Sequence, residues 1–494
     1  MSIPPRRWRS SFLAVLVGGA LFGAAIGPTS AADAAGAPSV RLIAASSTVT
    51  AYRYGAGPAY IDSGVLVAAV RGAFDIRARR AAYDQPITAT QYIHASDGLR
   101  QRALPSWVVA KGFRGMAGFL RARLTDEHGN TVMSRSRSFC PAGGDMRVNP
   151  NGPSEAKYPR YCDQNPFALG RVWGIDRGWA TPAFGWEGLT ADVPDGRYTL
   201  RVSIAPQYRD LFGIRSEHAS VTITVKVEPV DGCYDGCPED VRSNVLHGRG
   251  AAGTPGGPLG QARTLSTPTD DTLPDLVALP AWNIQVTNRN ERDYIEFAAT
   301  VWNAGPAPLL VEGYRRRGTD IMDAYQYFVR GEEILGRDKV GLMEYDRETG
   351  HEHWHFKQFA RYSLMNASRD RVIVSRKEAF CLAPTDAIDL ALPGAEWHPG
   401  SNDLGTLCGG QSAIWVRETL QAGWGDTYYQ SVPGQSLNIT RVPNGTYYMA
   451  VEANPTGLLH ERTASNNRVL RKVVLGGTRG ARTVIVSPWQ GLDL

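Results

Sequence analysis

The stretch Ser220-Val-Thr-Ile-Thr-Val-Lys-Val227 decides the fold class, because apolar and polar residues alternate along it and most of them are β-branched. Successive side chains of a strand point to opposite faces, so this pattern predicts a strand with one buried face. Similar β-rich runs occur at 65–69, 198–204, 295–302, 447–451 and 469–475, separated by glycine, proline and asparagine. Helical periodicity is scarce, and we therefore predict an all-β fold of the β-sandwich type.

The chain contains two stretches with the same order of features. The corresponding pairs are Val193-Pro-Asp-Gly-Arg-Tyr and Val442-Pro-Asn-Gly-Thr-Tyr, Ser138-Phe-Cys and Ala379-Phe-Cys, and Gly178-Trp and Gly423-Trp. This similarity predicts two β-sandwich-like domains related by duplication, at 38–228 and 273–476. Residues 229–272 are rich in glycine and proline and are expected to form a linker, and 477–494 a C-terminal tail.

The N-terminus has the layout of a secretory signal peptide. Arg6, Arg7 and Arg9 precede an apolar run at 12–26 and the small residues Ser30-Ala-Ala. This layout predicts a signal peptide at 1–32 and a secreted, extracellular protein, with an uncleaved anchor as the alternative. No later run is apolar enough to span a bilayer. The formal net charge of +5 is mild for 494 residues, and no lysine or arginine cluster in the sequence marks a nucleic-acid partner.

The six cysteines fall along the chain as three local pairs. In an exported protein an even number of cysteines predicts disulfides. The expected bonds are Cys140–Cys162, Cys233–Cys237 and Cys381–Cys408. A metal half-site is the alternative for Cys233 and Cys237, but no second pair is close in sequence to complete it.

Three histidines, His351, His353 and His355, stand at alternate positions. Alternate side chains share a face only in an extended chain, so we predict a strand or strand end here. In a straight strand the outer two would be roughly 13 Å apart, so one site that holds all three needs a bend or bulge. Imidazole ligands suit copper, zinc or iron, and the spacing does not choose among them. A surface histidine run is the alternative.

The first copy lacks these residues. The positions opposite His351, His353, His355, Lys377 and Tyr428 are Lys111, Phe113, Gly115, Ser136 and Ala183. This joint difference indicates that the histidines, the lysine and the tyrosine form one site in the second copy. We therefore assign the first copy a structural, docking or substrate-presenting role.

Residues 273–475 resemble the catalytic domain of the lysyl oxidase family, the copper amine oxidases that deaminate peptidyl lysine, in the form of a bacterial-type secreted member. The matching motifs, in the family's order, are Leu273-Pro-Asp-Leu-Val, His351-Glu-His-Trp-His, Lys377-Glu-Ala-Phe-Cys-Leu, Asp426-Thr-Tyr, Asn444-Gly-Thr-Tyr, Asn454-Pro and Asn466-Asn.

The resemblance implies an amine oxidase site. The three histidines correspond to copper ligands, and Lys377 and Tyr428 to the residues that form the lysine tyrosylquinone cofactor. A substrate amine, either peptidyl lysine or a small primary amine, would form a Schiff base with the quinone and leave as an aldehyde, while molecular oxygen is reduced to hydrogen peroxide. Asp426 is expected to take the substrate's α-proton, and a solvated turn aspartate is the alternative.

Some positions depart from the family's pattern. Arg361 stands where animal members have a histidine near the site, so proton transfer by that histidine is absent or rerouted. Trp424 and Gly425 replace a Cys-Tyr pair, which removes one disulfide. Tyr429 lies beside Tyr428, so the choice of quinone precursor between the two tyrosines stays open.

The resemblance also implies a calcium site. The residues at the corresponding positions are Asp275, Leu276 through its carbonyl, Glu461, Asn466 and Asn467. Carboxylate, amide and carbonyl oxygens are the ligands that calcium prefers. Thr463 replaces an acidic ligand there, and a plain Asn-Asn turn is the alternative.

The leading hypothesis is a secreted copper- and quinone-dependent amine oxidase. A non-catalytic copper-binding or matrix-adhesion β protein is the rival, motivated by Arg361 and by the first copy without histidines. A mononuclear zinc or iron enzyme would use the same histidines without any need of Lys377 or Tyr428.

Overall fold

The computed structural model describes residues 40–492 except for 96–97, 143–145, 161, 163–164, 186–187, 231–256, 261, 265–266, 332, 348–351, 376–378, 401–402 and 430–435. The predicted signal peptide at 1–32 and the expected Cys233–Cys237 bond therefore lie outside the described residues. So do His351 and Lys377. The described residues belong to one compact unit.

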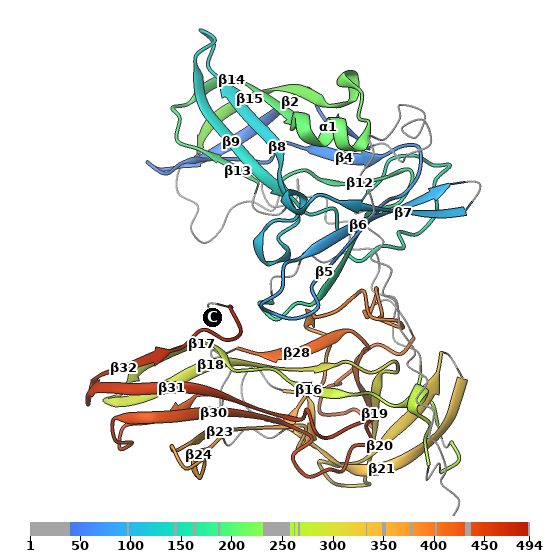
Figure 1. Cartoon of the computed structure of the whole chain (residues 1–494), viewed down its shortest axis with the longest axis vertical. Helices are drawn as coiled ribbons and strands as arrows, with labels where there is room; N and C mark the ends of the chain where they lie inside the picture. The colour runs from blue at the N-terminus through green and yellow to red at the C-terminus, as the bar shows by residue number, and fades with distance from the viewer. Residues whose placement is uncertain are drawn as a thin grey trace, which may run out of the picture. The chain divides into compact units, whose positions relative to one another are not determined.

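Strands dominate the first half of the chain (Figure 1). They are β1 (Val40–Ala44), β2 (Thr48–Tyr54), β3 (Ala59–Ile61), β4 (Val65–Ala69), β5 (Phe74–Arg79), β6 (Thr88–Ala95), β7 (Gly98–Leu104), β8 (Met116–Thr125), β9 (Thr131–Phe139), β10 (Met146–Arg147), β11 (Gly170–Ile175), β12 (Trp179–Pro182), β13 (Leu189–Ala191), β14 (Gly196–Ile204) and β15 (Ser220–Val230). The helical elements are α1 (Pro206–Phe212) and the 3-10 turns η2 (Ser106–Val108), η3 (Lys111–Phe113) and η5 (Ser216–His218).

The second half is built the same way, after the 3-10 turn η6 (Asp270–Thr272). Its strands are β16 (Leu276–Ala278), β17 (Trp282–Arg289), β18 (Arg292–Asn303), β19 (Leu309–Arg315), β20 (Ile321–Arg330), β21 (Glu333–Tyr345), β22 (Trp354–Lys357), β23 (Ala360–Met365), β24 (Arg371–Val374), β25 (Ala379–Phe380), β26 (Asp386–Ala387), β27 (Trp415–Leu420), β28 (Trp424–Tyr428), β29 (Leu437–Asn438), β30 (Gly445–Ala453), β31 (Arg468–Thr478) and β32 (Ala481–Val486).

These elements confirm the predicted all-β class. All six β-rich runs named from the sequence lie within strands, namely β4, β14, β15, β18, β30 and β31. The segment 477–494, expected as a tail, contains β32, which pairs with β31.

The sheets of the two halves correspond in strand order over part of their width. In the first half the orders are β1-β4-β12-β10, β11-β5-β6-β7 and a longer sheet that contains β15-β14-β8-β9. In the second half the orders are β16-β18-β28-β26, β27-β19-β20-β21-β22-β25 and a sheet that contains β31-β30-β23-β24. The strand β22, which contains the end of the histidine motif, extends a sheet whose counterpart in the first half ends at β7.

A local hydrogen bond also recurs. The Tyr198 hydroxyl donates to the Pro194 carbonyl at 2.8 Å, and the Tyr447 hydroxyl donates to the Pro443 carbonyl at 2.9 Å. In both cases the tyrosine ties the start of its strand to the turn before it, as tyrosine corners do in β-sandwiches.

The core of the second half lies between two sheets (Figure 1). Ile295, Phe297 and Val301 of β18 are buried against Val451 of β30 and Val473 of β31. A sheet that is apolar on one face must bury it against another element, and this sandwich satisfies that requirement. Among the described residues no helix is long and apolar enough to cross a membrane.

Backbone groups join the first half to the strand that precedes the candidate site. Gly170 forms a parallel bridge with Asp389, and the N–H of Leu390 donates to the Gly170 carbonyl at 3.1 Å. The buried Arg171 guanidinium donates to the Ala387 carbonyl at 2.5 Å. A Cβ at Gly170 would lie 2.0 Å from an Asp389 carboxylate oxygen, so a larger residue here would require that carboxylate to move. These contacts fix β26, which pairs with β28.

Part of the expected linker packs against the second half. The N–H of Leu259 donates to the Glu312 carboxylate at 3.2 Å, and the Arg417 guanidinium donates to the Gly257 carbonyl at 2.8 Å. Arg417 and Glu312 form an ion pair of 2.7 Å in which both side chains are fully buried. A buried ion pair needs its remaining hydrogen-bonding groups satisfied, and this segment of the linker supplies one partner to each side chain.

Candidate functional site

His353 and His355 lie at the start of β22. His353 lies in a bend directly before β22, and His355 is the second residue of β22. Their Nε2 atoms are 2.9 Å apart, and the rings meet edge to face. The prediction of a strand end with a bend is therefore confirmed for these two histidines.

Asp346 orients the pair. Its carboxylate lies 3.3 Å from Nδ1 of His355, and its backbone N–H donates to the His353 carbonyl at 3.0 Å. A histidine whose Nδ1 faces a carboxylate presents Nε2 to a metal, because the hydrogen bond fixes the tautomer and the ring orientation. The sequence reasoning did not single out Asp346, which is separated from the histidine motif by four residues.

The two histidines fit a metal ion. Nitrogens that each lie about 2.0 Å from one ion are about 3 Å from each other, which matches the observed Nε2 separation. Without an ion, two imidazole nitrogens at this distance can only share a proton. Within the described residues no group of three His, Cys, Asp or Glu side chains lies at metal-binding distance. The described residues include two of the three predicted histidine ligands, His353 and His355.

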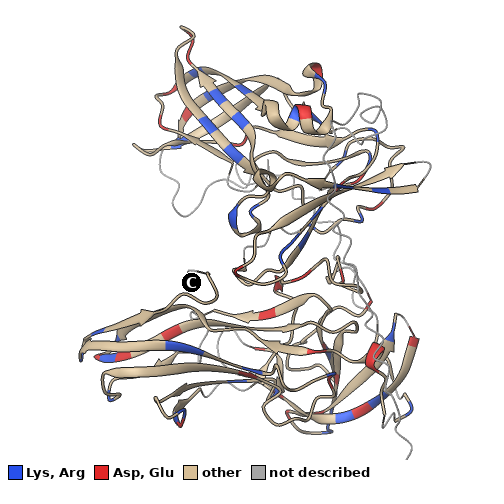
Figure 2. Ribbon diagram, viewed as in Figure 1, with Lys and Arg blue, Asp and Glu red and all other residues tan. Residues whose placement is uncertain are grey.

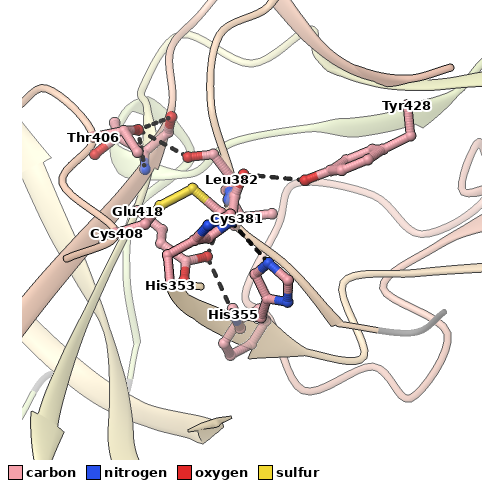
Figure 3. The surroundings of a disulfide bond; sticks show 10 residues. His353, His355, Cys381, Leu382, Thr406, Cys408, Glu418 and Tyr428 are labelled. Carbon is pink, nitrogen blue, oxygen red and sulfur yellow. Dashed lines mark hydrogen bonds between the residues drawn. A yellow bond between two sulfur atoms is a disulfide. The ribbon is translucent and has the colours of Figure 1, made fainter. Parts of the chain in front are cut away.

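Asp426 and Tyr428 share one face of β28, because they stand at alternate positions of the strand. Asp426 is 2% exposed. The Tyr428 hydroxyl donates to the Cys381 carbonyl at 3.1 Å, and its ring meets Phe380 edge to face at 4.6 Å. Figure 3 shows Tyr428 extending toward Cys381, with His353 and His355 on the other side of that segment.

The surroundings of Tyr428 keep its phenol protonated. Burial, followed by the negative charge of Asp426 and a hydrogen bond to that carboxylate, raises the pKa of Tyr428 well above its usual value. Burial likewise raises the pKa of Tyr362, whose ring also contacts Phe380. Tyr429 differs from its neighbour, since it is 43% exposed and its ring packs on Trp282.

A disulfide connects the histidine strand to the tyrosine. Cys381 and Cys408 are bonded, as predicted, and so are Cys140 and Cys162. The Trp354 N–H donates to the Cys408 carbonyl at 3.1 Å, between the two histidines. The disulfide therefore joins two cysteines of which one accepts a hydrogen bond from the histidine strand and the other accepts a hydrogen bond from Tyr428 (Figure 3).

Glu418 of β27 is a residue that sequence reasoning missed. It is fully buried, and its Oε2 accepts the N–H of Phe356 at 3.4 Å and the N–H of Leu382 at 3.0 Å. Its Oε1 is buried without a hydrogen-bond partner among the described residues. Burial, followed by the charge of Asp426, raises the pKa of Glu418 well above its usual value. The available signal was a charged Arg-Glu pair within the apolar run at 414–420.

The strand after Lys377 lies beside the histidine strand. β25 begins at Ala379 and pairs with β22, with Phe380 opposite Phe356. Lys377 itself is outside the described residues.

The predicted calcium ligands converge on one another. Glu461 accepts the Leu276 N–H at 3.1 Å and the Asn467 amide at 2.6 Å, and the Asn466 amide donates to Asp275 at 3.0 Å. The amide oxygens of Asn466 and Asn467 are buried without hydrogen-bond partners among the described residues. Burial raises the pKa of Glu461, and the nearby Asp275 raises it further. Orphaned amide oxygens beside two carboxylates fit a hard cation.

The fold and site define an all-β protein in which two histidines that fit a metal ion lie near a half-buried tyrosine and two buried carboxylates. No family model matches the chain. The chain is similar to lysyl oxidase homolog 4 of Mus musculus, with 26% identity over 144 residues, which is 29% of this chain and 17% of that protein. It is also similar to lysyl oxidase homolog 3B of Danio rerio, with 27% identity over 132 residues, which is 26% of this chain and 14% of that protein. The chain thus has a lysyl oxidase-like relation over part of its length, and the matched part spans less than a fifth of these relatives.

Proposed function

We propose that this protein is a secreted copper- and quinone-dependent amine oxidase that acts on peptidyl lysine or another primary amine. The observation that carries the proposal is the convergence of the His353–His355 pair and the Tyr428–Asp426 pair on the two sides of Cys381. The overall reaction converts the amine, oxygen and water to an aldehyde, ammonia and hydrogen peroxide. The partial similarity to lysyl oxidase homologues supports the same class.

In this proposal the three histidines hold copper, and Lys377 and Tyr428 are joined in lysine tyrosylquinone. Bound copper would supply the redox chemistry that oxidises the tyrosine ring. Asp426 holds the proton removed from the substrate's α-carbon, since it is buried and hydrogen bonded to Tyr428. Tyr428 is favoured over Tyr429 as the precursor, because Tyr428 faces Cys381 and Tyr429 is exposed.

A calcium ion bound by Asp275, Leu276, Glu461, Asn466 and Asn467 is part of the proposal. It would tie β16 to the loop before β31. Calcium added to chelator-treated protein should raise the melting temperature of the parent, and this rise should be lost in Glu461→Gln. An equal rise in both proteins would refute the site.

The first half is proposed to be a duplicated copy that lost this chemistry. The repeated strand orders and the repeated tyrosine-to-proline hydrogen bond support common ancestry. In the first half η3 occupies the stretch that the sequence comparison sets opposite the histidines. Disulfides are consistent with an oxidising compartment and with secretion through the predicted signal peptide.

Peptide mass spectrometry of copper-loaded protein tests the oxidase proposal. A covalent link between the peptides that carry Lys377 and Tyr428 is expected, together with amine-dependent peroxide. Lys377→Met and Tyr428→Phe should abolish both, and Tyr429→Phe is the matched control that should retain them. Copper binding without a crosslink would refute the oxidase and favour the non-catalytic copper-binding module. Selective binding of zinc or iron in its place would favour a mononuclear enzyme.

A further inference from the structure

A basic surface lies on the outer face of the longest sheet of the first half, whose order is β13-β3-β2-β15-β14-β8-β9. The inner face is apolar, with Leu200 and Val202 of β14 and Ile223 of β15 fully or almost fully buried. The alternate positions of these strands point outward. We call the following outward residues the basic face: Arg121, Arg123, Arg197, Arg201 and Lys226. Figure 2 shows basic residues side by side on neighbouring strands of this sheet.

The strand register brings like charges together on the basic face. Arg201 stands directly opposite Arg123, and Arg197 stands directly opposite Lys226. Like charges at directly opposed positions of adjacent antiparallel strands destabilise the pairing. Two such like-charge pairs lie on this one face, and each lowers the stability of the sheet. Their presence indicates that the positive charge is retained for binding.

Acidic neighbours do not neutralise the basic face. None of its five residues forms an ion pair with another residue of the described chain. Glu228 is the one acidic residue that points outward from β8, β14 and β15. At the edge of the sheet, Asp195 is paired with Arg53 at 2.8 Å. Asp126 accepts backbone N–H groups within its own turn.

Hydroxyl groups fill the positions between the charges. Outward Ser and Thr residues of β8, β14, β15 and the neighbouring β9 include Thr125, Ser134, Ser136, Thr199, Ser203, Ser220, Thr222 and Thr224. Two of the guanidinium groups are held by hydroxyls, since Arg123 donates to Thr131 at 2.8 Å and Arg201 donates to Ser220 at 3.2 Å. Farther along the same face Tyr52 stands opposite Tyr60, which is 39% exposed.

We propose that the basic face binds an extended anionic polysaccharide that carries carboxylate or sulfate groups. Charged groups on this sheet repeat at about 5 Å across strands and about 7 Å along them, a spacing suited to successive sugar units. The interleaved hydroxyls offer hydrogen bonds to sugar hydroxyls, and the tyrosines offer flat rings to sugar faces. A membrane-binding surface would present large apolar side chains, whereas this face presents short hydroxyls.

The test compares two double variants of the full-length protein. Arg123→Gln/Arg201→Gln removes two charges from the basic face. Arg316→Gln/Arg330→Gln removes two exposed charges from the second half, where each is paired with an aspartate. Affinity is measured by isothermal titration calorimetry with heparin, polygalacturonate and neutral dextran at two salt concentrations.

Parent protein should bind at least one of the two charged polymers, more weakly at higher salt, and should not bind dextran. Arg123→Gln/Arg201→Gln should bind about tenfold more weakly with a smaller salt dependence. The control should bind like the parent. The basic-face variant should also melt no lower than the parent, because it removes a repulsive pair, so loss of binding cannot be ascribed to unfolding.

The proposal is overturned if neither charged polymer binds, or if the control variant loses as much affinity as the basic-face variant. Tighter binding of single-stranded DNA or of phosphatidylserine vesicles would overturn the commitment to a polysaccharide. The test is independent of copper, the quinone and oxidase activity.

Discussion

Replacing Glu418 by leucine should destabilise the candidate site, because it removes a buried hydrogen-bond acceptor. The carboxylate accepts two backbone N–H groups, one next to His355 and one next to Cys381. Each of the two amides that loses its buried acceptor lowers the unfolding free energy by about 1–3 kcal/mol. Removal of the unpartnered Oε1 raises the unfolding free energy by about the same amount, which offsets the loss at one of the two amides. The net expectation is about 1–3 kcal/mol of lost stability for Glu418→Leu. Glu418→Gln keeps an acceptor oxygen and should stay within about 1 kcal/mol of the parent.

Hydrogen exchange followed by mass spectrometry measures the effect where it arises. The amides of Phe356 and Leu382 should be protected in the parent and in Glu418→Gln, and should exchange faster in Glu418→Leu. Because Leu382 follows the carbonyl that binds Tyr428, the leucine variant should also form less of the Lys377–Tyr428 crosslink. Equal exchange at both amides in the parent and both variants would refute the reasoning, whether or not the protein is an oxidase.

The difference in stability between the parent and Glu418→Gln should depend on pH. Burial raises the pKa of Glu418 above its reference value of 4.5 in the folded state. The folded state then binds the proton of Glu418 more tightly than the unfolded chain does. The contribution of Glu418 to the unfolding free energy therefore falls as pH rises from 4.5 toward the raised pKa of the folded state. Glu418→Gln has no such proton, and its stability relative to the parent should increase over this range in urea denaturation. A difference that does not change with pH would show that Glu418 is not perturbed.

Three further outcomes are expected. The pKa of Asp323 is lowered to about 2, first by a hydrogen bond from Arg316, and NMR titration should show that this pKa rises in Arg316→Gln. The stabilisation from the Asp323 carboxylate is present above the reference pKa of 3.8 and is lost as pH falls toward 2. Cys381→Ser opens a disulfide loop with a sequence separation of 27 and should cost roughly 3.5 kcal/mol of unfolding free energy, an unchanged denaturation midpoint being the contrary result. Tyr198→Phe and Tyr447→Phe each lose one equivalent hydrogen bond and should each cost about 1 kcal/mol, and a cost in one half only would contradict their equivalence.

The candidate site was predictable from sequence where spacing carries geometry. Alternate positions in β28 place Asp426 beside Tyr428. The same spacing at the bend before β22 brings His353 beside His355. Residues that act through long-range packing left weaker signals. Asp346 reaches His355 because the chain folds back between β21 and β22, and nothing in its local sequence marks that contact.

Charge patterns show the same limit. Along the chain the cations of the basic face fall into three groups, which are Arg121 with Arg123, Arg197 with Arg201, and Lys226 alone. Tens of residues separate these groups, and the sequence accordingly predicted no basic cluster. Antiparallel pairing of β8, β14 and β15 brings them to one surface. Register is set by the burial of one sheet face, which only the folded protein defines.

The sequence by itself determined the all-β class, the positions of six strands, the two disulfides within the described residues, and the pairs of candidate site residues that stand two positions apart in the chain. These features are local, because they follow from alternation, from glycine and proline turns, and from short loops between cysteines. Only the tertiary structure decided that Glu418 braces two segments of the site, that Asp346 orients His355, and that separate strands carry one basic face. These contacts join residues far apart in the chain, and they exist only once the sheets have paired and the core has been buried.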